Sequence, residues 1–187
     1  MSLYYQEYLN NEILVIPVHI IYKNNSKKPL FPLNWTNIET IEQCKELFIK
    51  HSEYNSIAVL TGTKNNLTVI DIDDLSVYEK NQDIFGKLDN YIIVNTNKGF
   101  HIYCKYNKNV KQTTNAIPGI DIRNDGGCVF CPPSSYMIEK EEMKYEFNEG
   151  NLLENISKLK NLPDIPIKFL EIIMSKKSIE IHDNENF

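Results

Sequence analysis

Val69-Ile70-Asp71-Ile72-Asp73-Asp74 is an apolar run that ends in acidic residues. If the run is a strand, alternation places Asp71 and Asp73 on one face and the isoleucines on the other. Two carboxylates on one strand face repel each other unless a cation lies between them. Mg²⁺ or Mn²⁺ would remove that repulsion, because hard cations bind carboxylate oxygens. The alternative is that the acidic residues cap a following helix, a role for which Asp74 is well placed.

A similar pattern occurs later in the chain, in Gly119-Ile120-Asp121-Ile122-Arg123. Asp121 is flanked by apolar residues, which predicts a short strand that carries one carboxylate. Arg123 follows two residues later and therefore lies on the same face, where its guanidinium could make a bidentate contact with phosphate. The alternative for Asp121 is a strand residue that faces solvent.

The segment Lys98-Gly99-Phe100-His101-Ile102-Tyr103 predicts a strand with Phe100 and Ile102 inward and His101 and Tyr103 on the opposite face. A single strand histidine is usually structural, whereas a functional His101 would donate a hydrogen bond to nucleotide phosphate. Glycines lie in turns near these polar residues: Gly62, Gly99, Gly126 and Gly127. Close approach of the backbone to a ligand and hairpin chemistry explain that clustering equally well.

The remaining pattern predicts an α+β fold with a mainly antiparallel central sheet flanked by helices. We expect helices at 3–9, 40–51, 74–85, 152–159 and 165–174. We expect strands at 13–21, 57–60, 67–72, 91–94, 100–106, 120–122, 128–131, 136–138 and 145–147. Glycine- and asparagine-containing turns predict two hairpins, 57–72 and 91–106, and 23–32 is predicted to be a turn-rich segment. One domain is expected over 1–174, followed by a polar tail or linker at 175–187.

The net charge of −5 argues against a protein that coats DNA by charge alone. Local lysine clusters could still follow a phosphate backbone, or could simply solvate loops: Lys27 with Lys28, and Lys105 with Lys108 and Lys111. No signal peptide and no apolar run of about 20 residues is present, so we expect a soluble, intracellular protein without a membrane partner. The sequence has no P-loop motif.

The four cysteines are expected to be reduced thiols, because a chain of this size without a signal peptide does not need disulfides. Cys128-Val-Phe-Cys131 has the spacing of a zinc-binding pair, but no second pair accompanies it. A structural zinc site is therefore not favoured.

Taken in order, these motifs resemble the bifunctional DNA primase/polymerase N-terminal domain of the archaeo-eukaryotic primase superfamily, found in plasmids, phages, mobile elements and large DNA viruses. Its first motif, two acidic residues one position apart after an apolar strand, matches Asp71 and Asp73. Its second, a small residue two places before a histidine, matches Gly99 and His101. Its third, an acidic residue before a Gly-Gly strand that runs into Pro-Pro-Ser, matches Asp121. The similarity covers nearly the whole chain.

The resemblance implies an RRM-like catalytic core with two metal ions, Mg²⁺ or Mn²⁺, bound by Asp71, Asp73 and Asp121. It also implies that His101 contacts the phosphates of an incoming nucleotide. We add Arg123 to the nucleotide contacts on geometric grounds.

Three more positions belong with the predicted nucleotide-binding residues. Lys98 stands where relatives tend to have the first of two glycines, so it either adds a phosphate contact or widens the turn before Gly99. Thr61 and Gly62 end the matching segment Ile57-Ala58-Val59-Leu60-Thr61-Gly62.

The function implied is template-directed nucleotidyl transfer in DNA replication, as a DNA primase, a DNA polymerase or both. The expected partners are a single-stranded DNA template, nucleoside triphosphates and a helicase domain or subunit in a longer protein, at the site of viral or mobile-element replication or in the cytoplasm. One alternative is a noncatalytic nucleic-acid or nucleotide-binding module that keeps the fold. A metal-dependent nuclease also needs clustered carboxylates, although the context of the histidine and glycine motifs does not suggest it.

Overall fold

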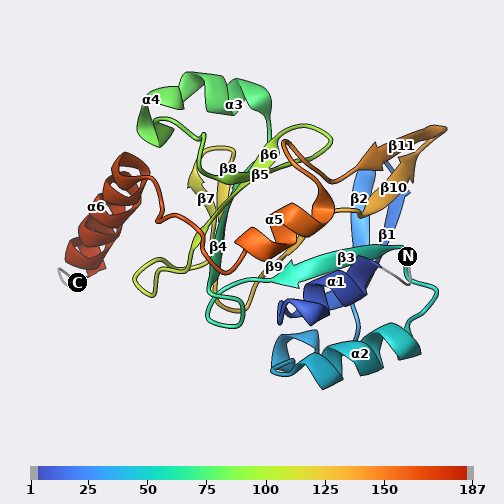
Figure 1. The fold of residues 1–187 in the computed structure, drawn as a ribbon. Helices are drawn as coiled ribbons and strands as arrows, with labels where there is room; N and C mark the ends of the chain where they lie inside the picture. The colour runs from blue at the N-terminus through green and yellow to red at the C-terminus, as the bar shows by residue number, and fades with distance from the viewer. Residues whose placement is uncertain (1–3, 185–187) are drawn as a thin grey trace.

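The structure is a computed structural model in which residues 4–184 are described (Figure 1). The helices are α1 (Tyr4–Asn10), α2 (Ile41–Lys50), α3 (Leu75–Lys80), α4 (Gln82–Phe85), α5 (Leu152–Lys158) and α6 (Ile167–Asn184), with the 3-10 helix η1 (Trp35–Asn37). The strands are β1 (Val15–Lys23), β2 (Ser26–Leu30), β3 (Ser56–Leu60), β4 (Leu67–Ile72), β5 (Ile92–Asn95), β6 (Phe100–Lys105), β7 (Thr113–Ile117), β8 (Ile120–Arg123), β9 (Cys128–Phe130), β10 (Ser135–Ile138), β11 (Glu141–Lys144) and β12 (Glu146–Phe147).

The strands of the described residues form two main sheets and a hairpin, and every strand pair is antiparallel. One sheet has the order β2-β1-β3-β9, and the other has the order β12-β5-β6-β4-β8-β7. Strands β10 and β11 pair with each other. The predicted fold class, an α+β fold with antiparallel sheets flanked by helices, is confirmed.

Apolar residues cover both faces of the six-stranded sheet, in two separate core clusters. On β4, Val69 belongs to the cluster shared with the four-stranded sheet, while Ile70 and Ile72 belong to a second cluster. Residues from α3, α4 and α6, among them Phe85 and Phe169, complete the second cluster. Figure 1 shows these helices on the side of the molecule away from α1 and α2. Alternate residues of a strand share a face. The next two positions on the face of Val69 are therefore Asp71 and Asp73, two of the predicted metal-binding residues.

The predicted hairpin between 57–60 and 67–72 is wrong, because β3 and β4 lie in different sheets. Strand β3 pairs with β1 and β9, and β4 pairs with β6 and β8. A single isolated bridge, Gly62 with Leu67, joins the two strands before they separate. Both strands are buried along most of their length, so each takes a central position with two neighbours. Local turn signals cannot predict that choice, because the competing partners are distant in the sequence.

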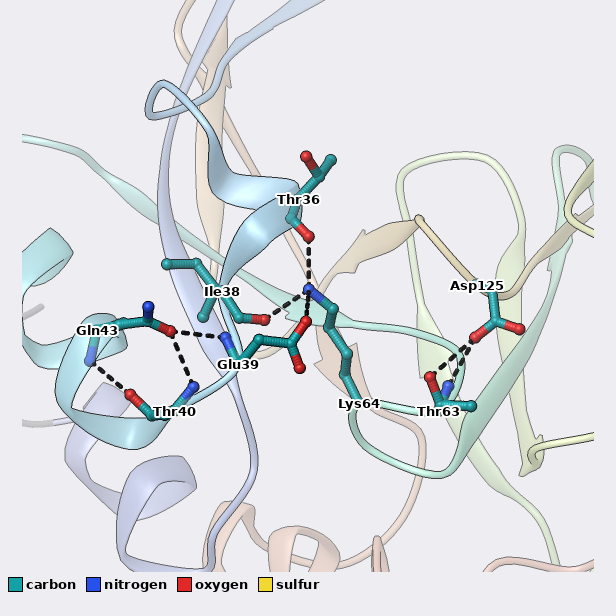
Figure 2. A network of polar contacts seen from close by, with 8 residues as sticks. All are labelled: Thr36, Ile38, Glu39, Thr40, Gln43, Thr63, Lys64 and Asp125. Atoms are coloured by element: carbon teal, nitrogen blue, oxygen red, sulfur yellow. Dashed lines mark hydrogen bonds and ion pairs between the residues drawn. The ribbon is translucent and has the colours of Figure 1, made fainter.

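Polar contacts hold the connection between β3 and β4 to the segment before α2 and to the loop between β8 and β9 (Figure 2). The Lys64 ammonium donates hydrogen bonds of 2.5 Å to the carbonyl oxygens of Thr36 and Ile38, just before α2. On the other side, the Thr63 backbone N–H donates to Asp125 Oδ1 over 2.8 Å, in the loop between β8 and β9. The connection between the two sheets is therefore tied to elements that flank each of them.

Three strands were not predicted: β2, β7 and β11. Most of their residues are exposed, and they lack the apolar alternation by which buried strands are recognised. The segment 23–32, predicted to be turn-rich, thus contains an edge strand, a position that also tolerates its proline.

Helix boundaries differ from the prediction most in two places. The segment 74–85 forms two short helices that meet at Asn81, rather than one. Helix α6 continues to Asn184, past its predicted end at Met174 and into the predicted polar tail. The predicted start of the first helix, residue 3, lies outside the described residues. The hairpin of β5 and β6 is confirmed.

Candidate functional site

The three central strands of the six-stranded sheet bring the predicted site residues into one row. Asp71 on β4 lies directly opposite His101 on β6 and directly opposite Asp121 on β8. Each neighbour comes from a different part of the sequence, so antiparallel register alone brings them together. Asp73 follows one alternation later, just past the end of β4.

His101 holds one side of Asp71. Its Nε2 lies 3.4 Å from Asp71 Oδ1, while its Nδ1 is buried without a hydrogen-bond partner. Burial by itself would raise the pKa of Asp71, but the hydrogen bond and the charge of His101, together with the charge of Arg123, hold it below its usual value. Asp71 is therefore an ionised carboxylate at neutral pH.

Arg123 bridges the row from the other side. Its Nη2 lies 2.6 Å from Asp121 Oδ2 and 3.6 Å from Asp71 Oδ2. The second oxygen of Asp121 accepts a hydrogen bond from the Asn115 backbone N–H over 2.8 Å. In this structure the guanidinium predicted to meet phosphate thus neutralises two carboxylates of the site.

The carboxylates are close enough to affect one another. Burial and the negative charges of Asp71 and Asp121 raise the pKa of Asp73 above its ordinary value. Such a set of carboxylate oxygens is the donor chemistry that Mg²⁺ and Mn²⁺ prefer, so the residue types fit a hard cation. Among residues 4–175, whose side chains the structure describes, however, no group of three or more His, Cys, Asp or Glu side chains is arranged as a ready metal site. In this structure the Asp121 carboxylate is paired with the Arg123 guanidinium.

A cleft of about 490 Å³ lies between the two sheets, and Asp71 and His101 of the row line it, whereas the buried Asp121 does not. Asp71, Asp73, His101, Arg123 and Lys98 line one wall. The opposite wall contains Lys27 and is rich in aromatic side chains from the four-stranded sheet and the residue after β2, from the hairpin and from the residue before β12: Tyr22, Phe31, Phe130, Tyr136 and Tyr145. The cleft therefore combines acidic, basic and aromatic groups.

Three other predicted nucleotide-binding residues are not among the cleft-lining residues. Thr61 is buried and donates a hydrogen bond of 2.6 Å to the carbonyl oxygen of Asn124. Gly62 has a φ of +81° and lies against Asp125, where a Cβ would collide with that residue. A Cβ on Gly99 would overlap the carbonyl oxygen of Ile72. In this structure all three positions serve packing and turn geometry.

The aromatic wall and Lys27 were not among the predicted site residues. Lys27 lies on β2, an edge strand that was predicted as a turn-rich segment, so nothing indicated which way its side chain points. The available sequence signal was the pair Lys27 and Lys28. Had the segment been recognised as a strand, alternation would have placed these two side chains on opposite faces.

A comparison with protein families gives a match over most of the chain. The family model described as bifunctional DNA primase/polymerase, N-terminal, matches residues 5–165. The chain belongs to this family. The resemblance to this family is thereby confirmed, and the fold agrees with it.

Membership in the DNA primase/polymerase family assigns the chain, at the level of the family, to enzymes that act on DNA and nucleotides and are typically metal-dependent. A search of curated proteins found no match. Within residues 4–184, no helix has the length and apolar character needed to cross a bilayer. The four cysteines are free, and Cys44, Cys104 and Cys131 are buried.

Proposed function

We propose that this domain catalyses template-directed nucleotidyl transfer, as a DNA primase, a DNA polymerase or both. The observation that carries the proposal is the row of Asp71, His101 and Asp121 across three paired strands, of which Asp71 and His101 line a cleft together with Asp73. Family membership over residues 5–165 supports the same activity independently of the geometry.

We propose Asp71, Asp73 and Asp121 as the residues that would hold Mg²⁺ or Mn²⁺. When bound, such ions lower the pKa of an attacking 3′ hydroxyl and neutralise the charge of the triphosphate. Asp71 and Asp73 line the cleft with their carboxylates, whereas Asp121 would have to exchange its contact with Arg123 for the cation. The released guanidinium would then be available to phosphate oxygens, as the sequence predicted.

His101 has two roles in this proposal. In the structure its Nε2 holds Asp71, which fixes the carboxylate at the centre of the row. On nucleotide binding we expect the imidazole to contact the phosphates, since His101 also lines the cleft. Lys98, at the cleft edge, adds a further positive charge for the same phosphates.

The test is incorporation of labelled nucleotides on single-stranded DNA with Mg²⁺ or Mn²⁺, with and without an annealed primer. Asp71→Asn and Asp73→Asn each remove one negative charge without changing side-chain size, and we expect both to abolish product. Asp74→Asn is the matched control, because Asp74 caps α3 through Ser76 and asparagine caps equally well. Product without a primer would show a primase, and product only with one would show a polymerase. Wild-type levels of product from Asp71→Asn would overturn the proposed site.

The alternatives predict different products in the same assay. A noncatalytic nucleic-acid or nucleotide-binding module would bind DNA or nucleotide without incorporation under any condition. A metal-dependent nuclease would shorten labelled DNA with Mg²⁺ in the absence of nucleotides. We also propose that the domain works beside a helicase. Mass spectrometry of the native gene product would show a linked helicase domain as a longer chain, and mass spectrometry of co-purified proteins would show a helicase subunit.

A further inference from the structure

Lys27 on β2 places its ammonium group inside a ring of aromatic side chains. Its Nζ lies 4.8 Å from the ring centroid of Phe130, 5.3 Å from that of Tyr145 and 5.8 Å from that of Tyr136. The same Nζ donates a hydrogen bond of 2.6 Å to Tyr145 Oη. We call Phe130, Tyr136 and Tyr145 the aromatic cage. Its members come from β9, β10 and the residue before β12, so the tertiary fold assembles it.

The aromatic cage fixes the ammonium without neutralising it. The ring face of Phe130 attracts a cation through its quadrupole, and Tyr145 offers its hydroxyl oxygen, yet neither group carries a net charge. An ammonium has three N–H donors, and among the described residues Lys27 has a single hydrogen-bond acceptor, Tyr145 Oη. Two donors therefore remain for a ligand, and the residue keeps part of its surface exposed to solvent.

The open side of Lys27 faces the proposed active site. Lys27 lines the same cleft as Asp71 and Asp73, although neither carboxylate comes within ion-pair distance of it. Burial lowers the pKa of Lys27, while the negative charges of Asp71 and Asp73 oppose that effect. The lysine thus lies in the field of the carboxylates without pairing with them, unlike Arg123, which pairs with both Asp71 and Asp121.

A fixed, unpaired ammonium in a cleft with metal-type carboxylates suits a ligand rich in anionic oxygens. We propose that Lys27 binds the phosphate chain of the incoming nucleoside triphosphate, and that the aromatic cage positions it for this contact. The inference rests on the proposed nucleotidyl-transfer function and adds to it a residue outside the acidic and histidine motifs. The DNA backbone is the competing phosphate source, but the position beside Asp71 and Asp73 favours the triphosphate, whose metal those residues would hold.

The experiment is calorimetric binding to the full chain in Mg²⁺, with dATP, dAMP and a single-stranded oligonucleotide as separate probes. Lys27→Met removes the charge and keeps the aliphatic stem, while Lys27→Arg keeps a cation that can lie over aromatic rings. The matched control is Lys28→Met, which makes the same change at the next residue of the same strand, on its other face. Thermal unfolding of each variant checks that the cleft remains folded.

For Lys27→Met we expect dATP binding to weaken roughly 10- to 100-fold, the range of a charge-assisted hydrogen bond. Binding of dAMP and of the oligonucleotide should change less than about threefold, and Lys28→Met should match the wild type for every probe. Lys27→Arg should recover most of the affinity for dATP. The preferential loss of dATP over dAMP is a readout that a merely structural role would not produce.

Four results would overturn the inference. Unchanged dATP binding by Lys27→Met, with a wild type that binds dATP, would remove Lys27 from the phosphate site and leave the proposed function intact. Equal losses for dATP and dAMP would indicate a structural role, and a loss confined to the oligonucleotide would indicate a contact with the DNA backbone. A wild type that binds neither dATP nor dAMP would refute the proposed function and this inference together.

Discussion

Gly99→Ala tests how closely the strand that carries His101 must pack on the strand that carries the aspartates. A Cβ at Gly99 would overlap the carbonyl oxygen of Ile72 and lie 2.9 Å from its carbonyl carbon and 3.0 Å from that of Asp73. These atoms are backbone at the end of β4, so no side chain can rotate away to make room. The two segments would have to separate by roughly 1 Å, an overpacking that costs about 3 kcal/mol of unfolding free energy.

The same displacement should impair activity more than stability alone explains. Asp73 is part of the backbone that has to move, and an error of roughly 1 Å in a catalytic group costs on the order of 100-fold in rate. Urea unfolding gives the stability change, and nucleotide incorporation well below the unfolding transition gives the activity of the folded enzyme. We expect Gly99→Ala to reduce both.

Gly126→Ala is the matched control for this prediction. Gly126 has a φ of +79°, and a Cβ added there would meet no atom within 4 Å, so alanine costs backbone strain of about 1 kcal/mol but displaces nothing. It should keep most of its activity. If Gly99→Ala loses less than about 1 kcal/mol and incorporates nucleotides like the wild type, the reasoning about backbone contact is refuted.

Further predictions concern residues outside the catalytic row. Lys64→Met should cost about 1–3 kcal/mol in urea unfolding, because two backbone carbonyls lose their donor, whereas exposed Lys45→Met should be neutral. Hydrogen bonds, first that from the Thr63 backbone N–H, lower the pKa of Asp125, so its ionised form stabilises the fold above about pH 4. The wild type should therefore exceed Asp125→Asn in stability at pH 7, and the difference should shrink as pH falls through the lowered pKa; a constant difference down to about pH 2.5 would contradict this. Burial raises the pKa of Cys128 to about 12, so a thiol reagent at about pH 8 should label it at least roughly 100-fold more slowly in the folded protein than in urea, as peptide mapping would show.

The sequence was sufficient for features that depend on local patterns. The apolar run that ends at Asp71 and Asp73 predicted a strand with both carboxylates on one face, and β4 has its apolar residues in alternating clusters as expected. The hairpin of β5 and β6 was predicted correctly because its turn lies between two apolar strands. Motif order also indicated the family, which the match to residues 5–165 confirms.

Other features depended on contacts between distant segments. Nothing local distinguishes a hairpin from a crossover between sheets, so β3 and β4 were wrongly paired, although both were recognised as strands. The exposed strand β2 carries too few apolar residues to be recognised from the sequence. The direction of the Lys27 side chain, which depends on that strand, could therefore not be predicted either. The aromatic cage and the pairing of Arg123 with Asp121 likewise require the register of separate strands. Side-chain chemistry and periodicity depend on neighbouring residues, whereas register and sheet membership are set by burial and hydrogen bonding across the whole chain.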